Sequence, residues 1–235
     1  MPNLVGIDGC KLGWLCIFEE LPSRRLASKT FETIDDLVRH IEALDVIAID
    51  VPIGLTDAGP RLCDQQARRL LGPVRGTSVF PAPIRAALDA PTYEEACARS
   101  LTAQNKKLPK QSWAIYPKIR ELDGLLQRRP ELKPKIFEVH PEVSFRAWNQ
   151  REPIVAPKKS EEGAATRLGL VAGHFGEQAF ATIRARYKRR DVADDDILDA
   201  FAALWTAERI QNREAETLPP DPPTDSRGLP MRMVY

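Results

Sequence analysis

Two apolar segments of this chain each end in an aspartate, and no other feature constrains the fold as strongly. They are LVGID at residues 4–8 and VIAID at residues 46–50. A continuous apolar run of this length is typical of a strand that is buried on both faces and parallel to a neighbour. A carboxylate in such a strand is costly unless it is paired or binds a cation. We therefore expect Asp8 and Asp50 to lie side by side at the ends of adjacent parallel strands, where ligands collect in open α/β sheets.

The order of the remaining segments indicates a mixed sheet. Apolar or alternating patterns predict five strands, at residues 4–8, 13–20, 24–32, 46–55 and 134–145. A helix is predicted at 33–44 and two more at about 160–186 and 194–212, from the spacing of their apolar residues. Three antiparallel strands, a crossover helix and a parallel strand follow the order of the ribonuclease-H-like fold. We expect an α/β protein with a mixed five-stranded sheet flanked by helices.

The length of 235 residues suits a single domain, here predicted at residues 1–215, with an insertion. Residues 56–134 contain many prolines and helical patterns without a strong strand, which predicts a helical insertion over one edge of the sheet. Residues 216–235 are rich in proline, so this tail is either an extended arm or disordered.

Composition excludes several classes of protein. The apolar runs are too short to span a membrane, and no basic segment precedes a long apolar stretch, so we expect a cytoplasmic protein. The four cysteines form no CxxC pair and the three histidines are scattered, so no zinc site is expected. The formal net charge is only +1. Basic clusters such as Lys158 and Lys159 permit phosphate contacts, or are simply solvated surface.

A third acidic position is predicted in the helix near residues 194–212. Asp196 and Asp199 are three residues apart and share a helical face. Asp194 is interpreted as an N-cap, and Asp195 as a first-turn residue that favours the helix dipole. Asp199 is a full turn further on, and the small residues that follow it allow the helix to lie close to the sheet. We therefore expect Asp199 near Asp8 and Asp50.

The segment FEVHPEVSF at residues 137–145 supplies three more candidates. Glu138 lies late in its predicted strand, and Pro141 ends that strand and opens a helix. His140 is a candidate for moving protons or, equally, a hydrogen-bonded structural histidine. Glu142 is a second candidate proton carrier, with a first-turn helix acid as the favoured alternative.

Strand-end aspartates together with an Asp-x-x-Asp helix suit two divalent ions about 3.5–4 Å apart that clamp a phosphodiester. Oxygen-only ligands favour Mg²⁺ or Mn²⁺. The competing interpretation of Asp8 is structural, as a cap on the turn between Gly9 and Gly13.

Six motifs together resemble a known family. They are GIDGCKLGW, AIDVPIGL, CDQQARRLLG, SVFPAP, EVHPEVSF and DDILDAFAAL. The combination is similar to the domain-of-unknown-function 429 family, an uncharacterised bacterial and archaeal family described as a predicted nuclease of ribonuclease-H-like fold. The resemblance covers residues 3–212 approximately. It implies acidic site positions at Asp8, Asp50, Glu138 and Asp199. The stretch DILDA also resembles the Asp-x-x-Asp-Ala helix of Holliday-junction resolvases with this fold, which supports Asp196.

The insertion offers candidate substrate contacts. Arg61, Asp64 and Arg68 are spaced by three and four residues and share a helical face. Lys118 is a candidate phosphate or supporting lysine. For each of these basic residues the alternative is a surface salt bridge.

Metal-dependent hydrolysis of DNA or RNA is the leading functional hypothesis. The second is an ATP-binding protein of the actin and sugar-kinase type, which shares the strand order. Such proteins need two domains of this kind around the nucleotide, and the first hairpin here lacks the usual Ser or Thr. The third is a catalytically silent protein that binds nucleic acid or acts as a scaffold. The sequence gives no oligomeric state.

Overall fold

The structure, a computed structural model, describes residues 3–20, 23, 25–40 and 44–235. Residues 41–43 of the predicted helix 33–44, and Arg24 of the predicted strand 24–32, lie outside the described residues. The chain divides into two compact units. The first contains residues 1–50, 134–215 and 234–235, and the second contains residues 51–133 and 216–233.

The first unit is built on a five-stranded mixed sheet in the order β3-β2-β1-β4-β5. Its strands are β1 (Asn3–Cys10), β2 (Gly13–Glu20), β3 (Arg25–Phe31), β4 (Leu44–Ile49) and β5 (Ile136–Glu138). β1, β2 and β3 are antiparallel, whereas β4 runs parallel to both β1 and β5. The predicted mixed sheet flanked by helices, consistent with a ribonuclease-H-like arrangement, is confirmed.

The first hairpin is tighter than its sequence indicates. β1 continues to Cys10, which pairs with Gly13 across a turn at Lys11 and Leu12. Asp8 lies within the ladder, opposite Leu15. Asp8 is therefore a strand residue, which does not support the alternative that it caps this turn.

The fourth strand ends earlier than predicted, at Ile49 instead of residue 55. Asp50 lies in a bend immediately after it. The apolar residues that follow, Val51, Ile53 and Leu55, are buried, but they belong to the second unit and form no strand. The continuous apolar pattern of residues 46–55 thus indicates burial, and only the first part of this segment forms a strand.

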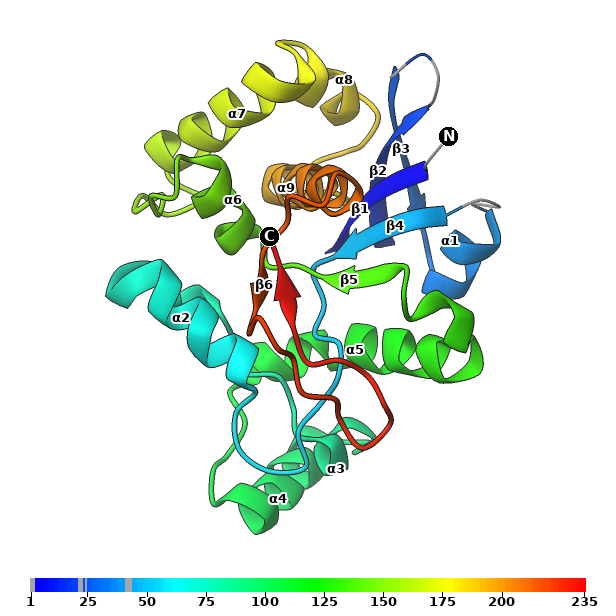
Figure 1. Cartoon of the computed structure of the whole chain (residues 1–235), viewed down its shortest axis with the longest axis vertical. Helices are drawn as coiled ribbons and strands as arrows, with labels where there is room; N and C mark the ends of the chain where they lie inside the picture. The colour runs from blue at the N-terminus through cyan, green and yellow to red at the C-terminus, as the bar shows by residue number, and fades with distance from the viewer. Residues whose placement is uncertain (1–2, 21–22, 24, 41–43) are drawn as a thin grey trace. The chain divides into compact units, whose positions relative to one another are not determined.

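Helices cover both sides of this sheet (Figure 1). They are α1 (Ile34–His40), α6 (Pro141–Trp148), α7 (Glu161–Phe175), α8 (Ala179–Arg184) and α9 (Asp194–Gln211). The predicted single helix at 160–186 is wrong, because it is α7 and α8 with a break from Gly176 to Gln178. α9 packs against β1, β2 and β4, while α1 lies on the other side of the sheet.

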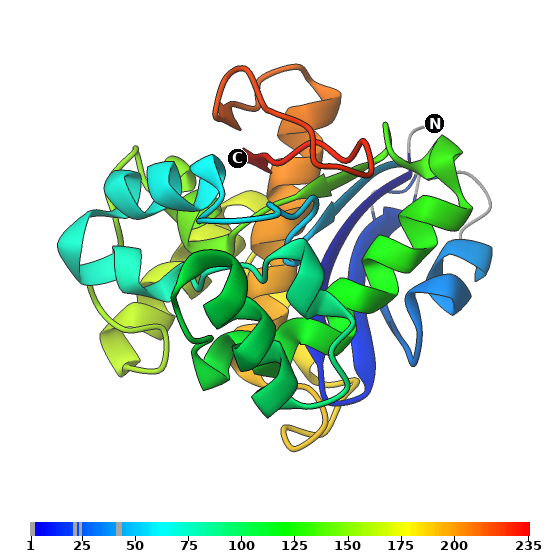
Figure 2. The same cartoon turned by 90° about the horizontal axis from the view of Figure 1, so that it is seen from below.

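A glycine lets α9 approach β1 closely. A Cβ atom added at Gly6 would lie 2.2 Å from both the carbonyl oxygen of Ala200 and the backbone nitrogen of Leu204. Any side chain at this position would therefore push the helix away from the strand. The residues of α9 from Ile197 to Ala207 are all buried, which places this helix in the core of the unit. Figure 2 shows α9, in orange, crossing behind the blue strands.

The second unit is mostly helical. Its helices are α2 (Leu62–Arg75), α3 (Arg85–Leu88), α4 (Tyr93–Gln104) and α5 (Lys110–Arg128), with short 3-10 turns at Gly76–Ser78 and Pro130–Leu132. The tail contributes β6 (Thr217–Leu218), which pairs with β7 (Met233–Val234). The tail is thus an extended, folded segment. Among the described residues, no helix combines the length and apolar character needed to cross a membrane.

Candidate functional site

Asp8 and Asp50 meet at the end of two parallel strands. β1 and β4 are in register up to the pair Ile7 and Ile49. The backbone N–H of Asp50 then donates a hydrogen bond to the carbonyl of Ile7 (3.1 Å), so the two chains stay aligned just past the end of β4. Because alternate strand residues point to the same face, Asp8 faces the same side of the sheet as Gly6, which is the side covered by α9.

The close approach of α9 brings a third carboxylate to this edge. Asp199 precedes Ala200, whose backbone contacts the space above Gly6. Asp199 is 5% exposed and Asp8 is 8% exposed, whereas Asp50 is half-buried. The structure thus brings together the three aspartates that the sequence pattern predicted to meet.

The three carboxylates shift one another's pKa values. Burial, followed by the charges of Asp199 and Asp50, raises the pKa of Asp8 well above its usual range. Burial and the charge of Asp199 raise the pKa of Asp50 to about 8. Burial also raises the pKa of Asp199 to about 6, although Lys158 lowers it. Like charges in a buried site favour protonation of some members, so nearby positive charge does not fully offset the three carboxylates.

Lys158 reaches into the site from the segment between α6 and α7. Its Nζ atom lies 2.8 Å from Oδ2 of Asp199 and 3.3 Å from Oδ2 of Asp195. Partial burial alone would lower the pKa of Lys158, but Asp199, Asp195 and Asp8 raise it. Lys159, by contrast, is 79% exposed and approaches only Asp195, at 3.8 Å. Of the two lysines proposed as substrate contacts, Lys158 is thus engaged by the carboxylates.

The other aspartates of α9 support the start of the helix. Oδ2 of Asp196 accepts a hydrogen bond from the backbone N–H of Ala193 (2.8 Å), so this oxygen satisfies the helix start. The predicted N-cap at Asp194 is wrong, because the N-cap is Ala193. Asp194 is the first residue of α9 and pairs with Arg184 at 2.9 Å.

Glu138 points away from the three aspartates. It pairs with Ile49 in the ladder, while the preceding pair, Phe137 and Ala48, packs on the side of α9. Alternation along the strand therefore directs Glu138 to the opposite face of the sheet. After burial and Asp199, Glu138 still contributes to the raised pKa of Asp50. The structure makes Glu138 a neighbour of the aspartate cluster and not a member of it.

Glu142 and His140 lie at the start of α6. Both oxygens of the Glu142 carboxylate accept hydrogen bonds from Nη2 of Arg167, at 2.8 and 2.7 Å. Arg167 is fully buried, so this ion pair is part of the core. His140 is the N-cap residue, and its carbonyl accepts the backbone N–H groups of Val143 and Ser144. This geometry favours the structural alternative for Glu142.

The candidates from the insertion lie in the second unit and have local partners there. Arg61 is 1% exposed, pairs with Asp64 at 2.6 Å and donates to the carbonyls of Ile53 and Gly54. Its guanidinium therefore holds the protein chain through a buried ion pair, and not through the surface salt bridge that was the alternative to a substrate contact. Lys118 lies on α5 and is half-buried.

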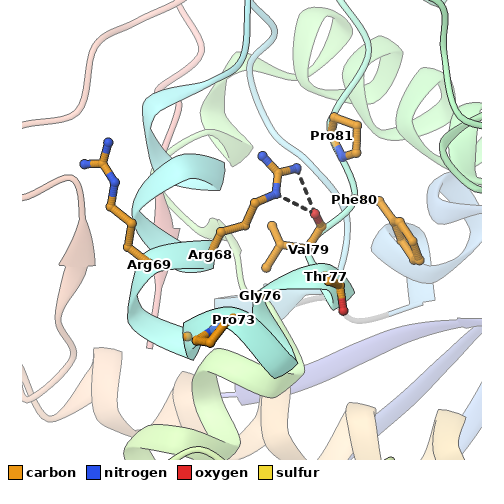
Figure 3. Close-up of a pocket in the computed structure, with 9 residues that line it drawn as sticks. Arg68, Arg69, Pro73, Gly76, Thr77, Val79, Phe80 and Pro81 are labelled. Atoms are coloured by element: carbon orange, nitrogen blue, oxygen red, sulfur yellow. Dashed lines mark hydrogen bonds between the residues drawn. The ribbon is translucent and has the colours of Figure 1, made fainter.

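Arg68 lines a surface pocket of about 700 Å³ in the second unit. Its guanidinium donates two hydrogen bonds to the Val79 carbonyl, at 2.9 and 2.8 Å (Figure 3). The two arginines predicted to share a helical face therefore have different partners. Arg61 pairs with Asp64, and Arg68 binds the Val79 carbonyl. Phe80, which also lines the pocket, is 46% exposed, so the pocket combines an aromatic ring with arginine side chains.

Comparison with known proteins identifies the family. A family model described as "Protein of unknown function (DUF429)" matches residues 6–224, which is most of the chain. The chain belongs to the DUF429 family. No curated protein and no solved structure matches it.

The aspartate cluster of this DUF429 protein suits a divalent cation. Oδ1 of Asp199 is buried and accepts no hydrogen bond within the described residues. Carboxylate oxygens are the donors that Mg²⁺ and Mn²⁺ prefer, and a cation would remove the repulsion within the cluster. The residues present therefore fit such an ion.

Two features of the site were missed in the sequence. Asp195 was assigned only to the helix dipole, yet it also contacts Lys158. The sequence pattern does not predict Arg167 as part of the surroundings of the site. The sequence feature that could have identified Arg167 is its position on a helical face. Gly163, Arg167 and Val171 are spaced four residues apart and form the buried face of α7. An arginine on a buried helix face requires an acidic partner, here Glu142.

Proposed function

We propose that Asp8, Asp50 and Asp199 bind Mg²⁺ or Mn²⁺ and that this protein hydrolyses phosphodiester bonds of DNA or RNA. The observation that carries the proposal is the meeting of three mutually repelling carboxylates, two of them buried and one half-buried, at the ends of two parallel strands. Lys158 supplies one positive charge to these three carboxylates, which leaves negative charge for a divalent cation to neutralise. The order of strands and acidic residues supports a nuclease over other uses of such a cation.

The side chains divide the work as follows. Asp8, Asp50 and Asp199 would hold the ion, which when bound acidifies a water molecule and offsets the charge of the phosphate. Lys158 fixes the orientation of Asp199 through its hydrogen bond. Glu142 is engaged in an ion pair with Arg167, so His140 is a better candidate than Glu142 to hold a proton. Exposed basic residues such as Lys159 supply contacts to the phosphate backbone.

Metal binding is tested by thermal melting of the full chain in EDTA and in millimolar Mn²⁺ or Mg²⁺. A ligand bound only by the folded state raises the free energy of unfolding, by about 2.7 kcal/mol at a ligand concentration a hundred times its Kd, and the melting temperature rises with it. We expect this shift for the wild-type protein and its loss in Asp199→Asn. Asp89→Asn, at an exposed position, is the matched control. Absence of a shift and of heat in calorimetry would contradict the proposal.

Hydrolysis is tested on single-stranded, duplex and branched DNA and RNA in the presence of Mn²⁺ or Mg²⁺. We expect cleavage of at least one substrate, abolished by EDTA and by Asp199→Asn. Metal binding without cleavage of any substrate would instead support the catalytically silent binding protein. Binding of ATP without cleavage would support the alternative of the actin and sugar-kinase type.

A further inference from the structure

We infer that the ammonium group of Lys158 takes the place of a second metal ion, so that this site holds a single divalent cation. The inference rests on the metal binding of the proposed function and revises the expectation of two ions. It concerns the site itself, and it stands whether the substrate is DNA or RNA.

The first support is the set of contacts that Lys158 makes. Its Nζ atom lies at hydrogen-bond distance from Asp199, at 2.8 Å, and close to Asp195, at 3.3 Å. Its positive charge also acts on Asp8 and Asp50, because it opposes the rise in the pKa of each. The ammonium thus hydrogen-bonds to Asp199 and acts electrostatically on the other two aspartates of the cluster.

The second support is that the chain holds Lys158 in position. Ser160, two residues on, accepts the N–H of Gly163 and donates both its backbone N–H and its hydroxyl to the Pro157 carbonyl. A Cβ atom at Gly163 would lie 2.1 Å from that same carbonyl, so α7 starts tightly against this segment. Buried Arg167 donates to the Gly163 carbonyl at 2.8 Å. The backbone that carries Lys158 is therefore held in place next to the start of α7.

The third support is charge balance. Asp8, Asp50 and Asp199 carry three negative charges when ionised, which one divalent ion and one ammonium neutralise. A second divalent ion is therefore not needed to neutralise these three charges. The adjacent carboxylates are otherwise engaged, since Asp195 lies between the two lysines and Asp196 accepts the Ala193 N–H.

The two oxygens of Asp199 show how the cations share this residue. Oδ2 accepts the hydrogen bond from Lys158, whereas Oδ1 is buried and accepts none within the described part of the chain. Asp199 can thus bind the ammonium through one oxygen and the metal ion through the other. Lys158 is a positioning residue in this arrangement.

The number of ions is measured by titrating the full chain with Mn²⁺ in a calorimeter at fixed pH and salt. We expect one ion per wild-type chain and two per Lys158→Gln chain, because the substitution vacates the second cation position. Lys158→Arg keeps the charge and should still bind one ion. Lys159→Gln removes an adjacent but exposed lysine and should also bind one. Electron paramagnetic resonance distinguishes a single Mn²⁺ from a coupled pair in the same samples.

Two ions in the wild-type protein would overturn the inference and leave the proposed function intact. One ion in a folded Lys158→Gln chain would also overturn it, whatever the affinity. If Lys158→Gln does not fold, as shown by circular dichroism in EDTA, the count in the wild-type protein and in Lys158→Arg decides. No bound ion in the wild-type protein would overturn the proposed function as well.

Discussion

Asp8 is buried beside three other carboxylates, and this environment raises its pKa. A folded-state pKa above the unfolded value means that the metal-free protein loses stability as pH rises from about 4. Asp8→Asn keeps the shape of the side chain and removes its charge. We expect it to stabilise the metal-free protein at neutral pH by ~1–2 kcal/mol, the scale of a one-unit pKa shift. Urea melts in EDTA measure this change.

The same variant should lose the rise in melting temperature with Mn²⁺. Asp199→Asn is an informative companion, because it also removes a partner of Lys158 and should therefore stabilise less than Asp8→Asn. A structural role for Asp8 predicts the reverse pattern, with lower stability in EDTA and an unchanged response to Mn²⁺. That result would exclude Asp8 as a ligand.

Residue types predicted part of the candidate site but not its counter-charges. Asp8, Asp50 and Asp199 are brought together by strand order and by a helix of small residues, and both are visible in the sequence. Lys158 lies 41 residues from Asp199, in a segment without periodicity. The face of the sheet on which Glu138 lies could not be predicted in this way. It depends on the register between β4 and β5, and that pairing begins only at Ile136.

Strands and helices were predicted well where their apolar pattern arises from burial in a single part of the structure. β1, β2 and β3 lie within a few residues of their predicted bounds, because sheet burial alone shapes their sequences. β4 was predicted too long, since the apolar residues after Asp50 are buried in the second unit. Helical periodicity likewise continued across the break at Gly176, where α7 ends.

The contact of α9 with β1 should control both stability and metal binding. In Gly6→Ala, the new methyl group would meet the backbone of Ala200 and Leu204 at 2.2 Å. We expect a loss of ~1–3 kcal/mol in the free energy of unfolding, as for overpacked cores. Because the helix must move away, Asp199 also moves and Mn²⁺ affinity should fall. Urea melts in EDTA and Mn²⁺ calorimetry measure the two effects.

Gly169→Ala is the matched control for this substitution. Gly169 lies within α7, and an added Cβ atom there meets nothing within 4 Å. Alanine at such a position should stabilise the helix by ~0.5–1 kcal/mol and leave Mn²⁺ affinity unchanged. If Gly6→Ala behaves like this control, close packing of α9 does not assemble the site.

At the scale of the whole molecule, residues 216–233 of the C-terminal tail are part of the second unit. Asp225 accepts the backbone N–H of Leu55 (3.0 Å) and pairs with Arg85. Arg85 and Arg227 also both pair with Asp123 of α5. Composition indicated an extended or disordered tail because proline and polar residues dominate it. Its partners lie 140 and 170 residues earlier in the chain, which no local pattern reveals.

The ion pairs of the tail predict a response to acid. Burial alone would raise the pKa of Asp225, but the backbone N–H groups of Leu229, Leu55 and Arg227, together with Arg85, lower it overall. Its contribution to stability is therefore complete above its unfolded-state pKa of about 3.9 and is lost as pH falls through the lower folded-state pKa. We expect Asp225→Asn to cost about 2 kcal/mol at neutral pH, since it weakens hydrogen bonds to a buried charge. In urea melts from about pH 6 to about pH 3, the gap between the wild-type protein and this variant should shrink only below about pH 4. A gap that stays constant or widens in acid would show that Asp225 does not hold the tail as an anion.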